Sequence, residues 1–521
     1  MVSFAWLVPL LPLLAAAGIG LGYIGGWNRD EAGERFTAAL ATTAAASSLL
    51  LLLVIDGFAL LHGIPGQVSH GIWLHSGDYV VQLSFNLDAL GLSLATLVAL
   101  IALLTLRFSI NYLHRESGFQ RFFMLLCLFM SAMLLIVLAG NALFTFIGWE
   151  LAGVSSYLLI AFALDRPVAS VNASRAFVTN RIGDAGFIIA LSLSLFWLDS
   201  VEWPAILACT NNLEMLQVGL IAATFLLPAL VKSAQVPFTP WITRALEGPT
   251  PSSAVFYGAL MVHAGVYLVI RLEPLLLQVP VLMMTLVLLG GATALYGFLV
   301  SLVQTDVKSA LMFSTIGQTG LMFLACGLGW FTFAAWHLAA HAAWRAYQFL
   351  SAPALMHLTD SRPSRPVPGW LQRRKWLYTA TLQRFWLDNV ADWLLVRPTR
   401  QLAQDTQAFD QQVVNRLVGL PGSASAVSSL AQWEAFRHGR TGRVVGDSGD
   451  VGHGRGAIGR LLEAIAALLH WFEEHLVLKG GDVGVLNLVQ RLGTVLARID
   501  VLLSEPRYLI LLIVITFIVI L

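Results

Sequence analysis

Residues 218–240 read VGLIAATFLLPALVKSAQVPFTP, an apolar run that continues without a loop into a lysine and two prolines. A charged side chain inside a membrane span costs about 2.5–3.5 kcal/mol on insertion scales, so an intramembrane lysine usually has a function. Pro237 and Pro240 lack backbone donors and end the helix shortly after Lys232. Non-helical backbone at membrane depth is tolerated only where protein or a water-filled cavity surrounds it. A buried lysine at a broken helix is typical of an ion pathway.

The composition of the chain is that of a polytopic membrane protein. Of its 521 residues, 57% are apolar and 12% are charged, unlike a typical soluble domain. The net charge of +1 argues against a nucleic-acid partner. Cys127, Cys209 and Cys326 are isolated and form no CxxC pair, and no glycine-rich phosphate motif is present. We therefore expect no cofactor, no metal and no redox site on this chain.

Length and apolarity predict an all-α fold with twelve transmembrane helices. They lie near residues 4–26, 36–62, 85–110, 121–140, 142–164, 176–198, 215–232, 252–272, 279–300, 309–328, 332–357 and 506–521. Basic loops around 107–121, 165–175 and 362–384 alternate with loops 63–84 and 199–214, which contain no lysine or arginine. The positive-inside rule places the basic loops in the cytoplasm and the N-terminus outside. We expect an integral protein of a bacterial inner membrane.

The character of the sequence changes after residue 358. Residues 359–500 mix charged and apolar side chains, which favours amphipathic helices lying along the cytoplasmic membrane surface. Within this region, residues 421–457 are rich in Gly, Ser and Arg and are expected to form a flexible loop. Residues 458–478 again show helical spacing, and residues 501–521 are expected to form a C-terminal anchor helix.

Glu150 is the second charge within a predicted span. It is either a carboxylate at a helix end near the interface or a buried carboxylate facing Lys232. In the second interpretation, moving one charge changes the protonation of the other, so a conformational step can drive a proton. Arg181 and Asp184 are three residues apart on one helix face, and we interpret them as a structural ion pair.

His337, His341 and Arg345 follow one another at intervals of four residues and therefore share one face of a helix. Three ionisable groups in one stripe at membrane depth favour a hydrated polar path. Metal binding by the two histidines lacks a third ligand. Three further residues allow two interpretations each. Tyr257 and His263 can be interpreted either as proton-relay groups or as packing residues. Lys308 can be interpreted either as a proton-relay group or as an ordinary cytoplasmic lysine.

Several ordered motifs together resemble a known family. They are FNLDAL at 85–90, GFQRFF at 118–123, GWE at 148–150, NRIGD at 180–184, KSAQVP at 232–237, GPTP at 248–251, QTDVK at 304–308 and the stripe from His337 to Arg345. The chain resembles the antiporter-like proton-conducting membrane subunits. These include the large distal subunit of respiratory complex I, the Mrp-type cation/proton antiporters and the membrane subunit of the DAB inorganic-carbon pumps.

This resemblance implies two inverted five-helix repeats, each with a broken helix, around a central hydrophilic axis. The first repeat would occupy residues 85–272, after N-terminal helices in 1–84. Residues 273–358 would form a second repeat that looks truncated. Glu150 and Lys232 match the family's charge pair, and Lys308, His337 and His341 match its central relay.

Two positions depart from the family pattern. Arg345 stands where the family usually has a lysine, and arginine does not deprotonate in proteins, so it would be a fixed charge or gate. Tyr257 falls where the family has a histidine, and His263 is an additional histidine nearby.

The resemblance implies a proton-translocating subunit of a complex I-like energy-converting complex, embedded in the lipid bilayer beside other subunits. If that complex is an NADH-quinone oxidoreductase-like translocase, this chain is at most its ion-translocating part, beside a redox or quinone module. One alternative is a DAB-type carbon pump, in which inward proton flow drives a soluble zinc hydratase-like subunit. A stand-alone antiporter would need both half-channels. A non-conducting structural homologue is the remaining alternative.

Overall fold

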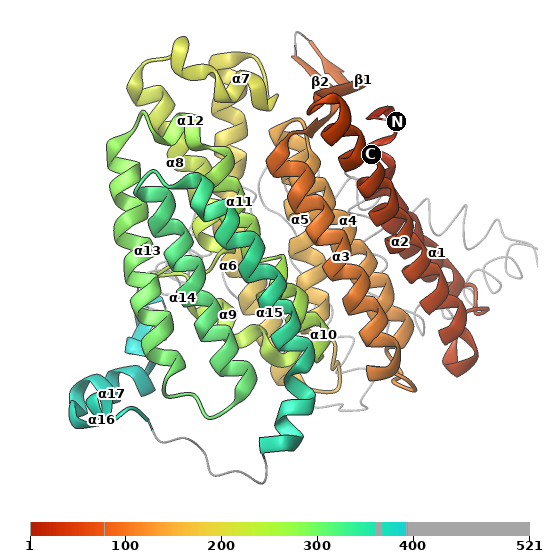
Figure 1. Ribbon diagram of the computed structural model, residues 1–521, viewed down its shortest axis with the longest axis vertical. Helices are drawn as coiled ribbons and strands as arrows, with labels where there is room; N and C mark the ends of the chain where they lie inside the picture. Colours follow the sequence, from red (N-terminus) through yellow and green to blue (C-terminus); the bar gives the residue numbers. More distant parts are fainter. Residues whose placement is uncertain (1, 78, 360–366, 392, 394–521) are drawn as a thin grey trace, which may run out of the picture. The chain divides into compact units, whose positions relative to one another are not determined.

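The computed structural model of this chain describes residues 2–77, 79–359, 367–391 and 393. The predicted loop 421–457, helix 458–478 and anchor helix 501–521 lie outside these residues. The described part is a helical bundle with one β-hairpin (Figure 1). The α-helices that precede the broken segment are α1 (Leu7–Ile24), α2 (Asp30–His62), α3 (Ala89–Tyr112), α4 (Phe119–Leu138), α5 (Ala142–Ile160), α6 (Pro167–Leu198), α7 (Trp203–Leu207) and α8 (Met215–Lys232).

The later helices include several short pieces. They are α9 (Pro240–Arg244), α10 (Thr250–Ser253), the π-helix η4 (Ala254–Ala259), α11 (His263–Arg271), α12 (Glu273–Leu276), α13 (Pro280–Ser301), α14 (Val307–Gly327), α15 (Phe331–Thr359), α16 (Gly369–Arg373), α17 (Lys375–Leu382) and α18 (Leu387–Ala391). The 3₁₀ turns are η1 (Val2–Phe4), η2 (Cys209–Asn211), η3 (Ala245–Glu247) and η5 (Arg384–Trp386).

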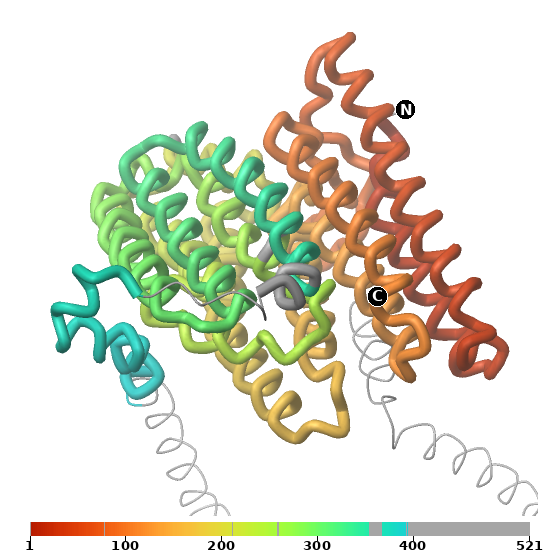
Figure 2. The backbone as a smooth tube through the Cα atoms, turned by 60° about the horizontal axis from the view of Figure 1, so that its bottom comes forward, coloured from red at the N-terminus to blue at the C-terminus, as the bar shows by residue number. Residues whose placement is uncertain are grey.

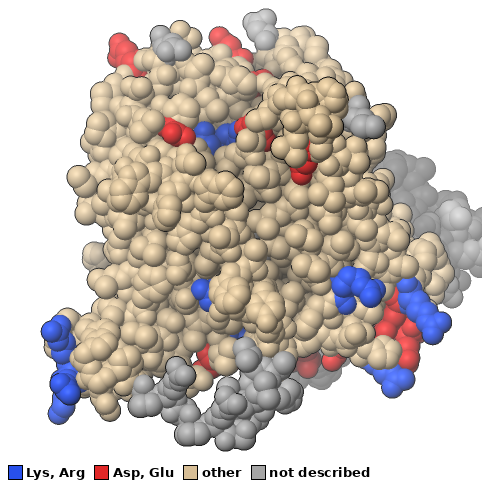
Figure 3. All heavy atoms as spheres, in the orientation of Figure 1, with Lys and Arg blue, Asp and Glu red and all other residues tan. Residues whose placement is uncertain are grey.

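The predicted fold class, an all-α polytopic membrane protein, is confirmed. Nine described helices are long and apolar enough to cross a membrane: α1 together with η1, then α2, α3, α4, α5, α6, α8, α13 and α14. Large apolar side chains point outward from them, among them Leu60, Phe196 and Leu288. Figure 3 shows that the middle of one face of the molecule carries few charged side chains, which lie mostly towards its two ends. This distribution suits a surface surrounded by lipid.

Helix α4 is almost wholly buried and packs mainly against α1, α2, α3 and α5. Figures 1 and 2 show α1 and α2 along one edge and α13 along the opposite edge. Aromatic side chains fill the space around α4; for example, the rings of Phe129 and Phe256 of η4 have centroids 5.6 Å apart. The core therefore lies between the N-terminal helices and the broken segments that follow α8.

Helices α13 and α14 pack unusually closely because glycines face each other along their contact. A Cβ atom on Gly290 would lie 2.5 Å from the backbone nitrogen of Leu324 and 2.7 Å from the carbonyl oxygen of Gly320. Any larger residue at position 290 would push the helices apart. Small residues at such contacts let helix backbones approach one another within a membrane.

Residues 63–84 were expected to form a loop, and the structure shows a β-hairpin there instead. Strands β1 (Gly66–Ser76) and β2 (Tyr79–Leu87) are antiparallel, and their register runs from Gly66 opposite Leu87 to Ser76 opposite Tyr79. The carboxylate of Glu202 accepts hydrogen bonds from Gln67 Nε2 at 2.8 Å and from Ser84 Oγ at 2.7 Å. These side-chain contacts attach the hairpin to the segment that precedes α7.

The prediction of one continuous helix over residues 252–272 is wrong. Helix α10 passes into the π-helix η4, which ends before α11 begins at His263. The hydrogen bonds change here from the α-helical spacing to the wider one, as in the 3.0 Å bond from Leu260 N to the carbonyl oxygen of Val255. Short π-helical segments are frequent at functional sites.

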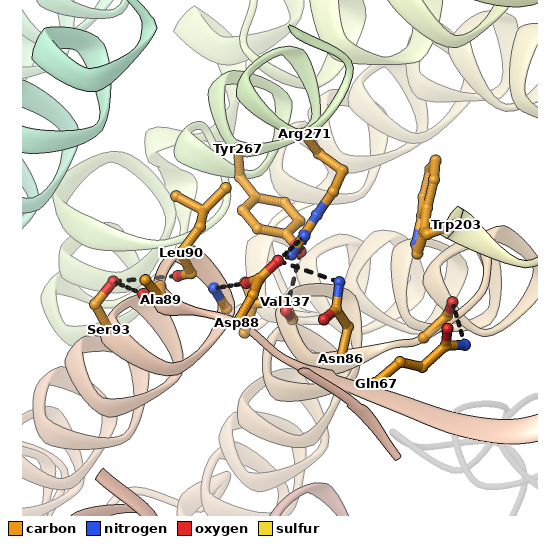
Figure 4. Close-up of polar contacts among 12 residues, drawn as sticks. Gln67, Asn86, Asp88, Ala89, Leu90, Ser93, Val137, Trp203, Tyr267 and Arg271 are labelled. Atoms are coloured by element: carbon orange, nitrogen blue, oxygen red, sulfur yellow. Dashed lines mark hydrogen bonds and ion pairs between the residues drawn. The ribbon is translucent and has the colours of Figure 1, made fainter. Parts of the chain in front are cut away.

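An ion pair between a buried arginine and a half-buried aspartate joins the end of α11 to the start of α3 (Figure 4). Asp88 caps α3 by accepting a 2.7 Å hydrogen bond from Gly91 N. Arg271 donates to both carboxylate oxygens of Asp88 and, at 2.7 Å, to the hydroxyl of Tyr267. Tyr267 in turn donates to the carbonyl oxygen of Val137 at 2.9 Å. Arg271 thus connects α11 to α3 directly, and Tyr267 of the same helix adds a contact with α4.

Candidate functional site

The broken helix begins where the sequence predicts it. Helix α8 ends at Lys232, and α9 begins at Pro240. Carbonyl groups at a helix end need partners from outside the helix, and here they have them. Trp241 Nε1 donates to the carbonyl oxygen of Val231 at 2.9 Å, and Gln235 N donates to that of Leu230 at 2.9 Å. The protein therefore supports non-helical backbone beside Lys232.

Lys232 is buried, with 1% of its surface exposed. Its Nζ donates to the backbone carbonyl of Trp149 at 3.3 Å and lies 5.0 Å from the centroid of the Trp149 ring. A desolvated cation over an aromatic face gains about 2 kcal/mol. Glu150 and Asp184 interact with Lys232 electrostatically at longer range. The direct contacts of the amine are thus with neutral groups.

Arg181 lies between the two carboxylates of this region. Its Nη1 pairs with Glu150 Oε2, and its Nη2 lies 2.9 Å from Asp184 Oδ2. We call Glu150, Arg181, Asp184 and Lys232 the charged cluster. Two cations and two anions leave it without net charge, which offsets part of the cost of burial.

The ion-pair partner of Glu150 differs from the one expected. No ion pair within 4.0 Å joins Glu150 to Lys232 among the described residues. Arg181 pairs with Oε2 of the carboxylate, and Oε1 is buried without a hydrogen-bond partner among them. A Cβ atom on Gly153 would lie 3.0 Å from Arg181 Nη2 and 3.7 Å from Lys232 Nζ. The two cations therefore border the same glycine of α5, which leaves room for both.

A second polar group starts at the first residue of α11. His263 Nε2 lies 3.0 Å from His341 Nδ1 of α15, and Arg345 Nε donates to His341 Nε2 at 3.4 Å. A neutral imidazole has one donor and one acceptor nitrogen. Since His341 Nε2 accepts from Arg345, its Nδ1 carries the proton and donates to His263. The proton of His263 then sits on Nδ1, which is buried without a partner.

His341 and Arg345, but not His263, border a cavity of about 690 Å³ beside α14 and α15. Its polar lining includes Ser301, Ser314, Gln318, His337, His341, Arg345 and Gln348. His337 Nε2 lies 2.8 Å from Gln318 Oε1, and Arg345 Nη2 donates to Ser314 Oγ at 2.9 Å. We call this cavity the α14–α15 groove. Sequence reasoning missed Ser314 and Gln318, although their spacing of four residues places both on one face of an apolar helix.

The broken segment after Lys232 connects the charged cluster to the histidines. Ser233 Oγ donates to the carbonyl oxygen of Val262, the residue before His263, at 2.6 Å. Gln235 Nε2 donates to Thr319 Oγ1, next to Gln318, at 3.4 Å. No described hydrogen bond joins Lys232 to His263 directly. The backbone that follows Lys232 therefore contacts the elements that carry the second polar group.

Two predicted residues lie apart from these contacts. Lys308 is half-buried in the first turn of α14, and it does not line the groove, although Val307 does. Tyr257 is fully buried in η4, where its hydroxyl has no hydrogen-bond partner and its ring lies 5.8 Å from that of Phe349. The structure gives neither residue a direct link to the histidines.

Two family models match the chain. The model described as NADH:quinone oxidoreductase/Mrp antiporter, TM, matches residues 139–365. The model described as NADH-Ubiquinone oxidoreductase (complex I), chain 5 N-terminus, matches residues 73–123. Together they match more than half of the 521 residues, and they include the charged cluster and the groove.

Similar proteins agree with these matches. The chain is 36% identical over 373 residues to NAD(P)H-quinone oxidoreductase subunit 5 of Ipomoea purpurea chloroplasts, covering 69% of this chain and 51% of the relative. It is 34% identical over 365 residues to NAD(P)H-quinone oxidoreductase chain 5 of Synechocystis sp., covering 68% and 53%. The chain thus spans about half the length of these relatives.

Two solved complexes contain similarly folded chains. In the Mrp complex of Dietzia sp. DQ12-45-1b, the matching chain has a TM-score of 0.59 and 26% identity, covering 70% of this chain and 39% of that one. In the membrane-bound sulfane sulfur reductase, an archaeal respiratory membrane complex, the TM-score is 0.58 at 18% identity, covering 67% and 70%. The second match concerns the fold alone.

Proposed function

Because this chain belongs to the NADH:quinone oxidoreductase/Mrp antiporter family of membrane subunits, we propose that it conducts protons as one subunit of a larger energy-converting complex. The observation that carries this proposal is the environment of the Lys232 side chain. Its amine is buried at a broken helix, and its direct contacts are neutral. An amine held in this way gains or loses a proton without first breaking an ion pair.

The charged cluster gives a means of coupling this protonation to conformation. Arg181 contacts both Glu150 and Asp184, which are the carboxylates that act on Lys232. Interactions between charges are strong away from water. If Arg181 withdraws from one carboxylate, that carboxylate acts more strongly on Lys232 and favours its protonated form. A movement of α5 against α6 would thereby load or release a proton.

The histidines provide a route for a proton beyond the cluster. His263 and His341 hydrogen-bond each other, and neutral imidazoles accept a proton at one nitrogen and release it at the other. Arg345 stays charged, so it is a fixed charge beside this line and does not itself carry a proton. The α14–α15 groove beside it is the candidate opening of the route. Lys308, Tyr257 and His337 remain candidate relay groups.

We further propose a complex I-like oxidoreductase with a redox or quinone module as the host complex. The relatives described above are named as NAD(P)H-quinone oxidoreductase subunits. The DAB-type carbon pump with its zinc hydratase-like subunit has no counterpart among them. Purifying the tagged chain from its native membrane and identifying the co-purified subunits tests the host. Redox subunits support the proposal, whereas a soluble zinc-binding partner contradicts it.

Proton flux in vesicles tests conduction itself. The purified complex is reconstituted with a pH-sensitive dye inside, and a potassium gradient with valinomycin supplies the driving force. Lys232→Ala and Glu150→Gln are each expected to lower the flux at least tenfold. Arg115→Gln is the control, because Arg115 pairs with Glu31 on the exposed surface. Unchanged flux in Lys232→Ala would mean that the chain is a structural subunit.

A further inference from the structure

We propose that residues 367–391 form a docking surface for anionic phospholipid headgroups at the membrane surface. We call these residues the α16–α18 segment. Composition predicts an amphipathic region after residue 358, but it does not say at what level the region lies or which headgroups it selects. The contacts, exposure and charge of the segment answer both questions, and none of them depends on proton conduction.

The α16–α18 segment is attached to two helices that are long and apolar enough to cross a membrane. The ring of Phe385 lies 6.0 Å from that of Tyr296 in α13. The guanidinium carbon of Arg384 lies 5.5 Å from the centroid of the Phe313 ring in α14. An ion pair of 3.2 Å with α9 adds a third attachment. These contacts fix the level of the segment along the bundle.

That level is close to the membrane surface. Helices α13 and α14 have 22 and 21 residues, so at about 1.5 Å per residue each is about as long as the hydrocarbon core is thick. Tyr296 lies near the end of α13 at Ser301, and Phe313 lies near the start of α14 at Val307. Both are within about 10 Å of those helix ends. The segment therefore lies where hydrocarbon gives way to headgroups.

Exposed aromatic side chains mark the same level. Trp370, Trp376 and Trp386 are 51%, 70% and 47% exposed. Tryptophan collects at membrane–water interfaces, because its ring is apolar and its N–H is polar. On α13, next to the contact with Phe385, Leu295 also points outward. Apolar surface that suits lipid thus continues from the span to the segment.

The charge of the segment selects the kind of headgroup. Arg373, Arg374 and Lys375 are consecutive and exposed where α16 passes into α17. Together with Arg384 they outnumber the one acidic residue of the segment, Asp388. Figure 3 shows Lys and Arg side chains at the place that α16 and α17 occupy in Figure 1. A basic run alone is usually an ordinary solvated loop. Beside exposed tryptophans at the level of the headgroups, it attracts anionic lipids.

A photo-crosslinking amino acid at position 376 identifies what the segment meets. The purified full chain, with the subunits that accompany it, is placed in nanodiscs of phosphatidylglycerol and phosphatidylcholine in equal amounts, and the adducts are identified by mass spectrometry. We expect phosphatidylglycerol adducts to outnumber phosphatidylcholine adducts at least about fivefold, the ratio that corresponds to about 1 kcal/mol for one basic residue near an anionic surface. The control position is Leu288, which is exposed within α13. A probe there should react with both lipids equally.

Removal of the basic residues tests the selection. With the probe at position 376, the triple variant Arg373→Gln/Arg374→Gln/Lys375→Gln should lose the preference for phosphatidylglycerol and still react with lipid through the apolar surface. The probe at Leu288 should respond as before in this variant, which verifies that the bundle is intact.

A second triple variant, Arg29→Gln/Arg35→Gln/Arg115→Gln, is the matched control. It removes the same charge from exposed residues beside α2, along the edge opposite α13 (Figure 1), and should leave the preference at position 376 unchanged. An equal loss in the two triple variants would assign the effect to net charge and overturn the proposal.

Two further results would also overturn the proposal. One is an equal reaction with both lipids at position 376 in the otherwise unchanged chain. The other is a product from native membranes that joins position 376 to a polypeptide in place of lipid. None of these readouts measures proton flux. Failure of the lipid assignment would therefore leave conduction standing, and failure of conduction would leave the lipid assignment standing.

Discussion

His263 and His341 come from helices far apart in the sequence, and their ring nitrogens Nε2 and Nδ1 lie 3.0 Å apart. Arg345 fixes the direction of this hydrogen bond, because it donates to the other nitrogen of His341. The order Arg345, His341, His263 therefore leaves a buried N–H on His263 without a partner. In the proposed route, this proton is the one available for transfer.

If the two histidines act as one relay, replacing either of them should abolish proton transfer through both. We expect His263→Phe and His341→Phe each to lower proton flux at least tenfold, since phenylalanine fills the space without offering a nitrogen. The double variant should be no slower than either single variant, because groups that act together are not additive. Flux into dye-loaded vesicles is the measurement. Trp336→Phe, on the exposed side of α15, is the control. Small effects that multiply in the double variant would contradict a shared relay.

Arg181 is expected to stabilise the protein through both carboxylates of the charged cluster. Arg181→Gln leaves Glu150 and Asp184 near each other without their cation, and breaking a buried pair in this way costs about 3–5 kcal/mol. We expect a clear drop in the midpoint of thermal unfolding in detergent. The double variant Arg181→Gln/Glu150→Gln should recover part of it, because one of the two repelling charges is gone.

Arg115→Gln serves as the matched control for this experiment. Its partner Glu31 is also exposed, and an exposed pair contributes under about 1 kcal/mol. A double variant that is as unstable as the sum of its single changes would contradict the coupling between Arg181 and Glu150.

The broken helix was predictable because it depends on local chemistry. A lysine in an apolar span, followed by two prolines, indicates where α8 ends, and α8 does end at Lys232. The partner of Glu150 was not predictable in the same way. Arg181 lies 31 residues from Glu150, and the spacing within α6 suggested only its pairing with Asp184. Which carboxylates one arginine contacts depends on how α5 packs against α6.

Other errors have equally specific causes. In the hairpin of residues 66–87, half-buried and exposed side chains alternate only over the first six residues of β1, a pattern too short to outweigh the expectation of a loop between two spans. The π-helix η4 retains the apolar composition of a span, so hydropathy alone does not separate it from α11. Predictions from composition thus located the spans, whereas the breaks depend on backbone hydrogen bonds.

The pair of Arg271 and Asp88 allows its charge to be tested separately from helix capping. Asn caps helices about as well as Asp, so Asp88→Asn keeps the cap of α3 and removes only the charge opposite Arg271. We expect a loss of about 3–5 kcal/mol of unfolding free energy, because a buried arginine is left unpaired. Asp306→Asn is the control, since Asp306 caps α14 through Ser309 N at 2.7 Å and forms no ion pair among the described residues. Equal losses in both variants would assign the effect to capping.

The contact between α13 and α14 offers two adjacent glycines with opposite expectations. A Cβ atom on Gly290 would lie 2.5 Å from Leu324 N, whereas one on Gly291 would meet nothing within 4 Å. Alanine is favoured over glycine in a helix by about 1 kcal/mol, so Gly291→Ala should be neutral or stabilising. Gly290→Ala forces α14 away, and overpacking of this kind costs about 1–3 kcal/mol. Thermal unfolding of the two variants measures the difference. Because α14 carries Ser314 and Gln318, Gly290→Ala should also weaken proton flux, and an equal response of the two variants would contradict the close contact.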